Sequence, residues 1–342
     1  MKLSLKIILV FFLFGVVINA QSGIPRHIIK GLSFVASPRP FESDPFVDVK
    51  KVNSDWIAVI PYSFTRGGSD PKVHYNHDEN DKKWWGESRK GIEETIVQAQ
   101  ANHLKIMLKP QVWYGRDWIG NLQFDNKKDW ESWESSYEDY ILPFAELAES
   151  SCVEILCIGT EIKQSVSQRP QFWERLIQKV RARYSGMITY AANWDEYKHI
   201  NFWNKLDYIG IDAYFPLSEK TTPELAELMN PWDEVLNTLE KFSRKYNRKI
   251  LFTEYGYLSV DGSAGKTWEL EANLNKLNYN QEAQANSIQA LLECCCKKDF
   301  WSGGFLWKWY PEPHNMRHDL QKDHSPQGKL AEEVLRKCYS KM

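Results

Sequence analysis

The sequence predicts a single-domain α/β protein of the (β/α)8 barrel type, a TIM barrel. From residue 28 onward, short apolar runs alternate with longer amphipathic runs about eight times. Neither a low-complexity linker nor a long charged block interrupts this pattern in the 342-residue chain, which argues for one domain. Strand followed by helix, repeated eight times in roughly 300 residues, is the pattern of a closed parallel barrel.

The strands are predicted from short runs rich in apolar, β-branched and aromatic residues. Eight runs qualify, at residues 28–34, 55–64, 105–113, 154–160, 187–194, 208–214, 249–253 and 303–307. Because the parallel strands of a barrel all end at one face, the side chains that follow these runs are expected to meet around a common opening.

The helices are predicted from apolar residues at three- and four-residue spacing between the strands. Five segments show this spacing clearly, at residues 88–101, 130–150, 170–184, 231–246 and 281–298. Ser88 and Asn280 stand at the start of two of these segments and are suited to N-capping. An open doubly wound sheet is the alternative fold. It would need a phosphate-binding glycine turn after the first strand, and Gly31 is followed by no such turn.

Residues 1–20 resemble a secretory signal peptide. Lys2 and Lys6 precede an apolar run at residues 7–18, which closes at Ala20. The run is short for a membrane span, which needs about 20 residues. We therefore expect cleavage near Ala20, a mature catalytic domain at residues 21–342, and export to a periplasm or to the extracellular space. An uncleaved anchor is the alternative.

The charge of the chain argues against nucleic acid as a partner. Removal of Lys2 and Lys6 changes the formal net charge from −2 to −4. No stretch of lysine and arginine is dense enough to follow a phosphate backbone. The expected partner is therefore a neutral polymer, and no stable membrane insertion is expected once the signal segment is removed.

The cysteines and histidines support neither a disulfide framework nor a metal centre. Three of the six cysteines are adjacent in a predicted helix, and two flank a predicted strand that holds them too far apart to pair; the six are Cys152, Cys157, Cys294, Cys295, Cys296 and Cys338. The closest histidine pairs, His74 with His77 and His314 with His318, are expected to lie in surface loops. We expect no metal ion and no organic cofactor.

Two glutamates occupy equivalent places in the predicted barrel. Glu161 follows the strand at residues 154–160 and Glu254 follows the strand at residues 249–253, each directly after a threonine. Hydrolysis of a glycosidic bond needs one carboxylic acid that protonates the leaving oxygen and a second carboxylate that attacks the sugar or activates water. The pair therefore predicts a sugar-cleaving site. Taken singly, each could instead be a solvated loop residue or the partner in a salt bridge.

Polar side chains gather at two other strand ends. Lys109, Gln111 and Trp113 alternate along the third predicted strand, so they are expected to share one side and to line one wall of the cleft. The alternative for Lys109 is an ion-paired residue at the end of the strand. Tyr214 ends the sixth strand, next to the strand of Glu254, and is placed either to donate a hydrogen bond to that carboxylate or to line the barrel wall.

Aromatic residues at strand ends are expected to bind sugar. Trp307 and Trp309 share a side at the end of the eighth strand, and Asn193 and Trp194 end the fifth. An indole ring offers a flat apolar surface to the C–H face of a pyranose. Most of the 15 tryptophans are nevertheless expected to be core residues, for example Trp56, Trp130, Trp133 and Trp301.

Five runs in one order resemble glycoside hydrolase family 113, an endo-β-1,4-mannanase-like group of retaining (β/α)8 enzymes whose catalytic glutamates end strands four and seven. The runs are CIGTE at 157–161, YAANWD at 190–195, LDYIGIDAYFP at 206–216, FTEYGY at 252–257 and GGFLWKW at 303–309. The resemblance covers nearly the whole mature chain. It implies cleavage of β-linked mannose-containing poly- or oligosaccharides with retention of configuration.

The resemblance also implies roles for the two glutamates. Glu161 would be the acid/base and Glu254 the nucleophile of a double displacement. Many members of the wider clan have asparagine before the acid/base, where it contacts the sugar 2-hydroxyl, whereas this chain has Thr160. That difference is compatible with an axial 2-hydroxyl, as in mannose. Two other functions remain open: the same chemistry on β-glucan or another β-hexose polymer, and a non-catalytic carbohydrate-binding barrel.

Overall fold

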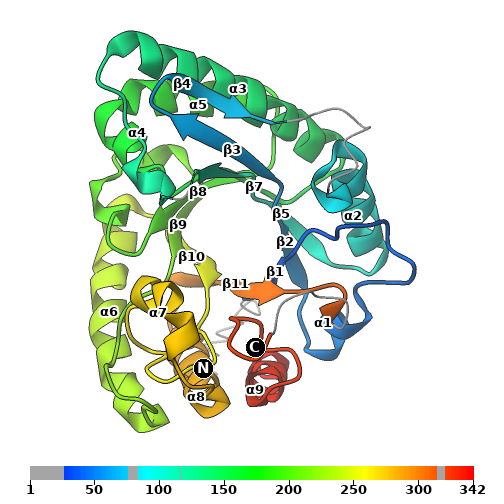
Figure 1. The fold of residues 1–342 in the computed structure, drawn as a ribbon, viewed down its shortest axis with the longest axis vertical. Coiled ribbons are helices and arrows are strands. Elements are labelled where there is room, and N and C mark those ends of the chain that lie inside the picture. Colours follow the sequence, from blue (N-terminus) through cyan, green and yellow to red (C-terminus); the bar gives the residue numbers. More distant parts are fainter. Residues whose placement is uncertain (1–26, 76–83, 116, 314–319) are drawn as a thin grey trace, which may run out of the picture.

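The protein folds as a closed eight-stranded barrel, as the sequence predicts. The computed structural model describes residues 27–75, 84–115, 117–313 and 320–342. The barrel order is β1-β11-β10-β9-β8-β7-β5-β2, and neighbouring strands are parallel (Figure 1). The strands are β1 Ile29–Phe34, β2 Trp56–Val59, β5 Lys105–Leu108, β7 Ile155–Thr160, β8 Met187–Asn193, β9 Tyr208–Asp212, β10 Lys249–Tyr255 and β11 Trp301–Trp309.

Helices surround the barrel on its outer side (Figure 1). They are α1 Val47–Lys51, α2 Arg89–Ala101, α3 Lys127–Ser150, α4 Lys163–Gln168, α5 Pro170–Arg181, α6 Leu225–Tyr246, α7 Thr267–Ala272, α8 Gln281–Cys295 and α9 Leu330–Ser340. Short 3-10 turns lie at η1 Trp85–Glu87, η2 Ile119–Asn121, η3 Tyr197–His199, η4 Trp203–Lys205 and η5 Leu274–Lys276. The five predicted helices are therefore confirmed as α2, α3, α5, α6 and α8, and both predicted N-caps, Ser88 and Asn280, accept backbone hydrogen bonds.

Helix α6 begins earlier than predicted. The prediction starts the helix at Pro231, from the spacing of its apolar residues. In the structure Pro231 lies inside the helix. The helix begins at Leu225, where Glu224 and Glu227 form a reciprocal capping box.

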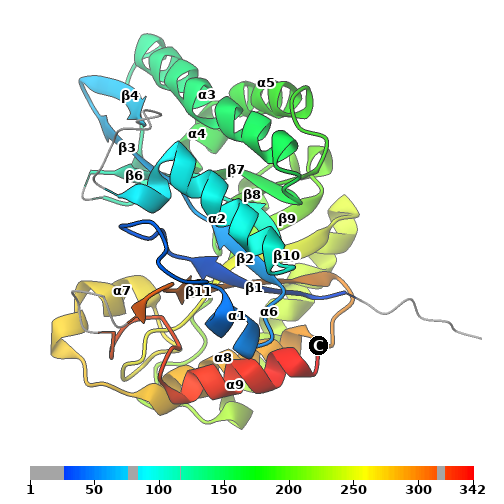
Figure 2. The same cartoon turned by 90° about the vertical axis from the view of Figure 1, so that its right-hand side faces the viewer.

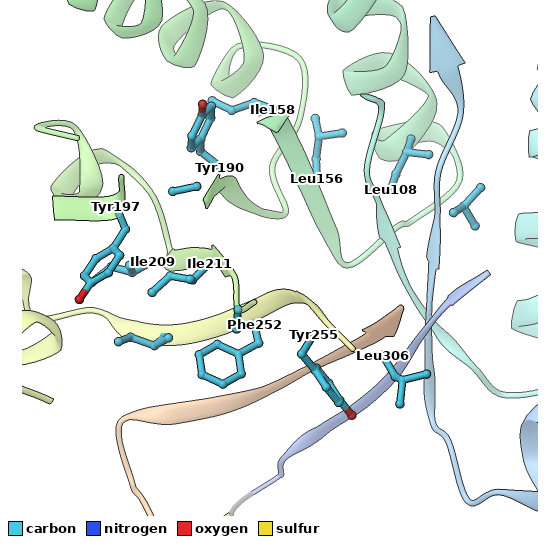
Figure 3. Close-up of a cluster of buried hydrophobic side chains, with 14 of the residues drawn as sticks. Leu108, Leu156, Ile158, Tyr190, Tyr197, Ile209, Ile211, Phe252, Tyr255 and Leu306 are labelled. Carbon is cyan, nitrogen blue, oxygen red and sulfur yellow. The ribbon is translucent and has the colours of Figure 1, made fainter. Parts of the chain in front are cut away.

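The core divides between the two sides of the barrel wall. Along β7, Ile155 and Cys157 belong to a cluster inside the barrel, whereas Leu156 and Ile158 belong to the larger cluster between strands and helices. Figure 3 shows part of this outer cluster, including Leu156 and Ile158. The alternation follows from the two-residue period of a strand. Both sides of each barrel strand are therefore apolar, as expected for a buried parallel sheet.

Two predicted strands were too long, because each is interrupted by a proline. Pro61 separates β2 from β3 Tyr62–Gly67, and Pro110 separates β5 from β6 Gln111–Tyr114. Together with β4 Asp70–His74, the detached ends form a second sheet of order β4-β3-β6, which we call the small sheet. Proline has no N–H to donate to a strand ladder, so the barrel ladder stops at both positions. Figure 2 shows the small sheet and α7 at the same end of the barrel.

Other features of the sequence have simpler outcomes. All six cysteines fall in the described ranges, and no disulfide joins them there. Trp56, Trp130, Trp133 and Trp301 are buried, as predicted. In the described part of the chain, no helix has the length and apolar character needed to cross a membrane. The predicted signal segment at residues 1–20 lies outside the described residues, so export stays a prediction.

Candidate active site

A cleft of about 570 Å³ opens where the barrel strands end. Glu161 and Glu254 both line it, and both also line an adjoining cavity of about 170 Å³. Glu161 directly follows β7 and Glu254 lies on β10, 93 positions apart in the chain. The structure therefore brings the two sequence-predicted carboxyl groups to one space.

Glu254 is surrounded by hydrogen-bond donors. It lies on β10 and only 7% of it is exposed. The Gln111 amide donates to Oε1 at 2.7 Å, the Tyr214 hydroxyl donates to Oε2 at 2.8 Å, and the Lys109 ammonium also donates to Oε1. Hydrogen bonds from an ammonium, an amide and a hydroxyl group hold a carboxylate in a fixed orientation. The predicted contact from Tyr214 is therefore present.

Lys109 lies beneath the cleft rather than in its wall. Its side chain is fully buried, and its ammonium group bridges Glu254 and Asp212, with 3.2 Å to Asp212 Oδ1. Burial lowers the pKa of Lys109, but Asp212 and Glu254 outweigh it and hold that pKa above its ordinary value. Lys109 and Gln111 both donate to Glu254 Oε1 and Trp113 lines the cleft, so the three side chains do lie on one side, although Pro110 separates β5 from β6 between them.

Asp212 is the second acid of this buried cluster, and the sequence reasoning missed it. The Thr253 hydroxyl donates to its Oδ1 at 2.8 Å. Burial, followed by repulsion from Glu254, raises the pKa of Asp212 to about 7, although Lys109 acts in the opposite direction. A signal was available in the sequence: Asp212 ends an apolar strand, as the two glutamates do.

Glu161 has a different environment from Glu254. The Trp118 indole N–H donates to its Oε2 at 2.5 Å. Burial raises the pKa of Glu161 well above its ordinary value, and the charges of Asp212, Glu254 and Glu196 act in the same direction, against the Trp118 hydrogen bond. Glu161 therefore keeps its proton to a higher pH than an ordinary glutamate. It also has a positive φ of 54°, which is uncommon outside glycine.

Aromatic side chains form much of the cleft wall. Trp113, Trp194 and Trp307 line it, as predicted, and so does Asn193. Two further tryptophans, missed by the sequence reasoning, are Trp118 and Trp268, and the Trp268 ring stacks on Trp194 with centroids 5.8 Å apart. Both lie outside the barrel strands: Trp118 stands directly before η2, and Trp268 lies in α7, two short elements that the sequence pattern did not predict.

The prediction that Trp309 lines the cleft was wrong. Its side chain is 1% exposed and belongs to the outer core cluster. Leu306 pairs with Leu32 but Trp309 pairs with Phe34, so three steps along β11 match two along β1. This bulge breaks the two-residue alternation that placed Trp307 and Trp309 on one side.

The histidines are described only in part. His74 forms a hydrogen bond with Asp70 at 2.7 Å, whereas His77, His314 and His318 lie outside the described residues. Among the residues that the structure does describe, no group of three or more His, Cys, Asp or Glu side chains is arranged to hold a metal ion.

Solved structures with a similar fold include several glycosidases. A GH113 β-1,4-mannanase, solved as a complex, is 24% identical with a TM-score of 0.78, covering 92% of this chain and 100% of that one. GH113 β-mannanase AaManA from Alicyclobacillus acidocaldarius, in complex with ManMIm, is 22% identical with a TM-score of 0.77, covering 92% and 97%. A β-glucuronidase from Ruminococcus gnavus is 13% identical with a TM-score of 0.62, covering 91% and 50%. At these identities the likeness shows the fold.

The family is shown by the sequence itself. No curated protein matches the chain. The sequence profile of glycoside hydrolase family 113 matches residues 43–329, which is well over half of the chain and includes both strand-end glutamates. The resemblance seen in the five runs is thereby confirmed: this protein belongs to glycoside hydrolase family 113 and is an enzyme that hydrolyses O-glycosyl bonds.

Proposed function

We propose that the protein is a retaining β-mannanase that cleaves β-linked mannose-containing poly- or oligosaccharides, with Glu254 as nucleophile and Glu161 as acid/base. The observation that carries the proposal is the contrast between the two glutamates in one cleft. Glu254 accepts hydrogen bonds from three side chains, whereas Glu161 is half-buried near other acids and has a raised pKa. Environments that differ in this way separate a nucleophile from an acid.

The reaction proceeds in two steps. In the first, a Glu254 oxygen attacks the anomeric carbon while Glu161 transfers its proton to the leaving oxygen, which forms a covalent glycosyl-enzyme and releases the first product. In the second, ionised Glu161 takes a proton from water, the water oxygen attacks the anomeric carbon, and the bond to Glu254 breaks. Two inversions give net retention, and the enzyme returns to its starting protonation state.

The other cleft residues bind and position. Trp113, Trp194 and Trp307 supply flat apolar surfaces for pyranose rings, and Asn193 supplies an amide for hydroxyl groups. Lys109 and Tyr214 hold the Glu254 carboxylate in place from opposite oxygens, so they are positioning residues. No step of this chemistry calls for a metal ion or an organic cofactor.

The choice of mannose rests on the family and on the fold neighbours that are described as β-mannanases. Purified protein incubated with a panel of β-mannans and β-glucans is expected to release reducing sugar chiefly from β-1,4-mannan. Chromatography of the products over time identifies the oligosaccharides formed. Exclusive cleavage of a β-glucan would overturn the choice of sugar, and turnover of no polymer or oligosaccharide would overturn the proposed activity.

The raised pKa of Glu161 predicts a pH-dependent effect of Glu161→Gln on stability. Below the ordinary pKa of 4.5 the carboxyl is protonated in both the folded and the unfolded state, so the variant and the wild type are expected to unfold alike. As pH rises above that value, the unfolded state releases its proton and the folded state does not. The free energy of unfolding of the wild type therefore falls, relative to that of the variant, by up to about 1.4 kcal/mol per pH unit. Thermal unfolding at pH 4 to 7.5 measures this.

A matched control has the opposite sign. Exposed Glu333 has a pKa lowered to about 2 by its hydrogen bonds with Arg336 and Lys337. Glu333→Gln is therefore expected to give no stabilisation at any pH. A Glu161→Gln variant whose unfolding temperature follows that of the wild type at every pH would contradict the environment assigned to Glu161.

A further inference from the structure

The small sheet has one buried face and one exposed face. Along β3, Ser63 and Thr65 are buried, whereas Phe64 is 44% exposed. On β6, Val112 is buried and Trp113 is 59% exposed. The buried side faces α3, where the Val73 N–H donates to the Ser136 hydroxyl at 2.9 Å. The exposed side carries Tyr62, Phe64, His74 and Trp113, which we call the aromatic face.

Strand pairing places the aromatic face in one row across the small sheet. Phe64 pairs with His74 on β4 and with Trp113 on β6. The row therefore crosses two spacings between strands, roughly 10 Å. Its rings form two pairs: Phe64 and His74 are stacked with centroids 4.9 Å apart, and Tyr62 and Trp113 lie 5.3 Å apart. Such a surface is longer than one pyranose ring.

The aromatic face continues directly from the active site. Gln111 pairs with Tyr62 in the small sheet, and the same Gln111 donates a hydrogen bond to Glu254. Trp113 lines both the main cleft and the adjoining cavity, and Tyr62 lines the adjoining cavity. A polysaccharide that leaves the cleft past Trp113 therefore reaches Phe64 and His74 next.

The polar groups beside the aromatic face suit an uncharged, hydroxyl-rich ligand. The Arg66 guanidinium lies 5.8 Å from the centre of the Phe64 ring, and it also lies 3.8 Å from the Asp70 carboxylate. His74 is held by the same carboxylate. Positive and negative side chains lie next to each other, so the aromatic face has no net charge that would favour an ionic ligand. Flat rings flanked by planar donors and acceptors match a sugar, which has apolar C–H faces and a polar rim.

We propose that the aromatic face is a distal binding surface for the polysaccharide substrate, which holds sugar units beyond those at the bond being cleaved. The proposal deepens the proposed function and rests on it, because the proposed function sets the direction in which the polysaccharide leaves the cleft. Exposed rings that lie beyond the catalytic cleft contribute to substrate binding only when the substrate is long enough to reach them. Dependence on chain length is therefore the property to measure.

The test compares Phe64→Ala with Phe64→Tyr and with Val97→Ala, a variant of an exposed apolar residue on α2 outside both cavities. The value of kcat/KM is measured on oligosaccharides of increasing length, made of whichever sugar the wild type cleaves in the substrate panel. For Phe64→Ala, the ratio of kcat/KM on long chains to that on short chains is expected to fall roughly fivefold to tenfold. Phe64→Tyr keeps the ring and is expected to keep the ratio, and Val97→Ala is expected to match the wild type.

Affinity electrophoresis in gels that contain β-mannan or β-glucan supplies a readout without turnover. Phe64→Ala is expected to be retarded less than the wild type in the gel of the sugar that binds. Preference for glucan would overturn the choice of mannose and leave the aromatic face supported. An unchanged ratio with unchanged retardation would overturn the aromatic face as a binding surface. A second result would also overturn it: a concentration-dependent dimer, seen by sedimentation, that Phe64→Ala dissociates while the ratio of kcat/KM on long and short chains stays the same.

Discussion

Glu254→Ala is expected to lower kcat/KM on a natural β-linked substrate by about 10⁴-fold or more, the scale seen when a nucleophile or its base is removed from a hydrolase. Glu254 is the carboxylate that three donors hold at the floor of the cleft, so its loss removes the group proposed to form the glycosyl-enzyme. The loss is measured from initial rates on the best substrate of the panel. Circular dichroism and thermal unfolding check that the variant is folded.

Azide distinguishes the two carboxyl groups. With an activated aryl glycoside and sodium azide, Glu254→Ala is expected to give a glycosyl azide of inverted configuration, because azide enters the space left by the nucleophile. Glu161→Ala is expected to lower kcat/KM by roughly 10² to 10⁴-fold on a substrate with a poor leaving group. With azide it should give the product of retained configuration, because the glycosyl-enzyme still forms. An inverted azide from Glu161→Ala would reverse the two roles.

Lys109→Met is expected to lower the free energy of unfolding by about 3–5 kcal/mol, the range for breaking a buried ion pair. Lys109 is fully buried and is held between Asp212 and Glu254. Its removal leaves two carboxyl groups together without a cation, and the pKa of Asp212, already about 7, rises further because Lys109 opposes that rise. Activity is expected to fall as well, since Glu254 loses a donor. Thermal and denaturant unfolding measure the loss.

The pH dependence of this loss has a definite sign. Below pH 7, Asp212 is largely protonated in the folded wild type and in the folded variant, so its protonation affects both stabilities equally and the deficit of Lys109→Met is expected to be smallest there. The deficit should grow as pH rises above about 7, because the folded wild type then releases a proton that the folded variant, with its higher Asp212 pKa, keeps. A deficit that shrinks as pH rises through 7 would contradict the charge arrangement of this cluster.

Two controls separate charge from packing. The double variant Lys109→Met with Asp212→Asn removes one charge of each sign and is expected to regain most of the lost stability. Lys179→Met breaks an exposed pair with Glu138, at 2.5 Å, and is expected to cost less than about 1 kcal/mol. If Lys109→Met were as mild as Lys179→Met, Lys109 would not hold the cluster together.

Much of the fold could be predicted because the signals are local. Each barrel strand is buried on both sides, so β7 and β10 read as short continuous apolar runs in the sequence. Helix starts at Ser88 and Asn280 were predictable because the capping side chain bonds to a backbone N–H three residues away. The two splits at Pro61 and Pro110 were missed, although proline is itself a local signal, because apolar or aromatic residues resume within two positions after each proline.

The candidate site could be predicted only in its outline. Glu161, Glu254, Gln111, Trp113, Tyr214, Asn193, Trp194 and Trp307 reach the cleft or its carboxylates, because side chains at the ends of parallel strands converge. Trp309 was misplaced because a bulge in β11 depends on pairing with β1, which a strand pattern does not contain. Trp118 and Trp268 were missed because both lie outside the barrel strands, where the strand pattern gives no direction for a side chain.

The sequence by itself determined the family, the succession of strands and helices, and the identity of the two strand-end glutamates, since each depends on residues close together in the chain. Only the tertiary structure decided that Lys109 lies between Asp212 and Glu254, at separations of 103 and 145 positions. It also decided that the small sheet extends the cleft with an aromatic face. The physical reason is that closure of the barrel and strand register set these distances, and with them the burial that fixes each group's charge.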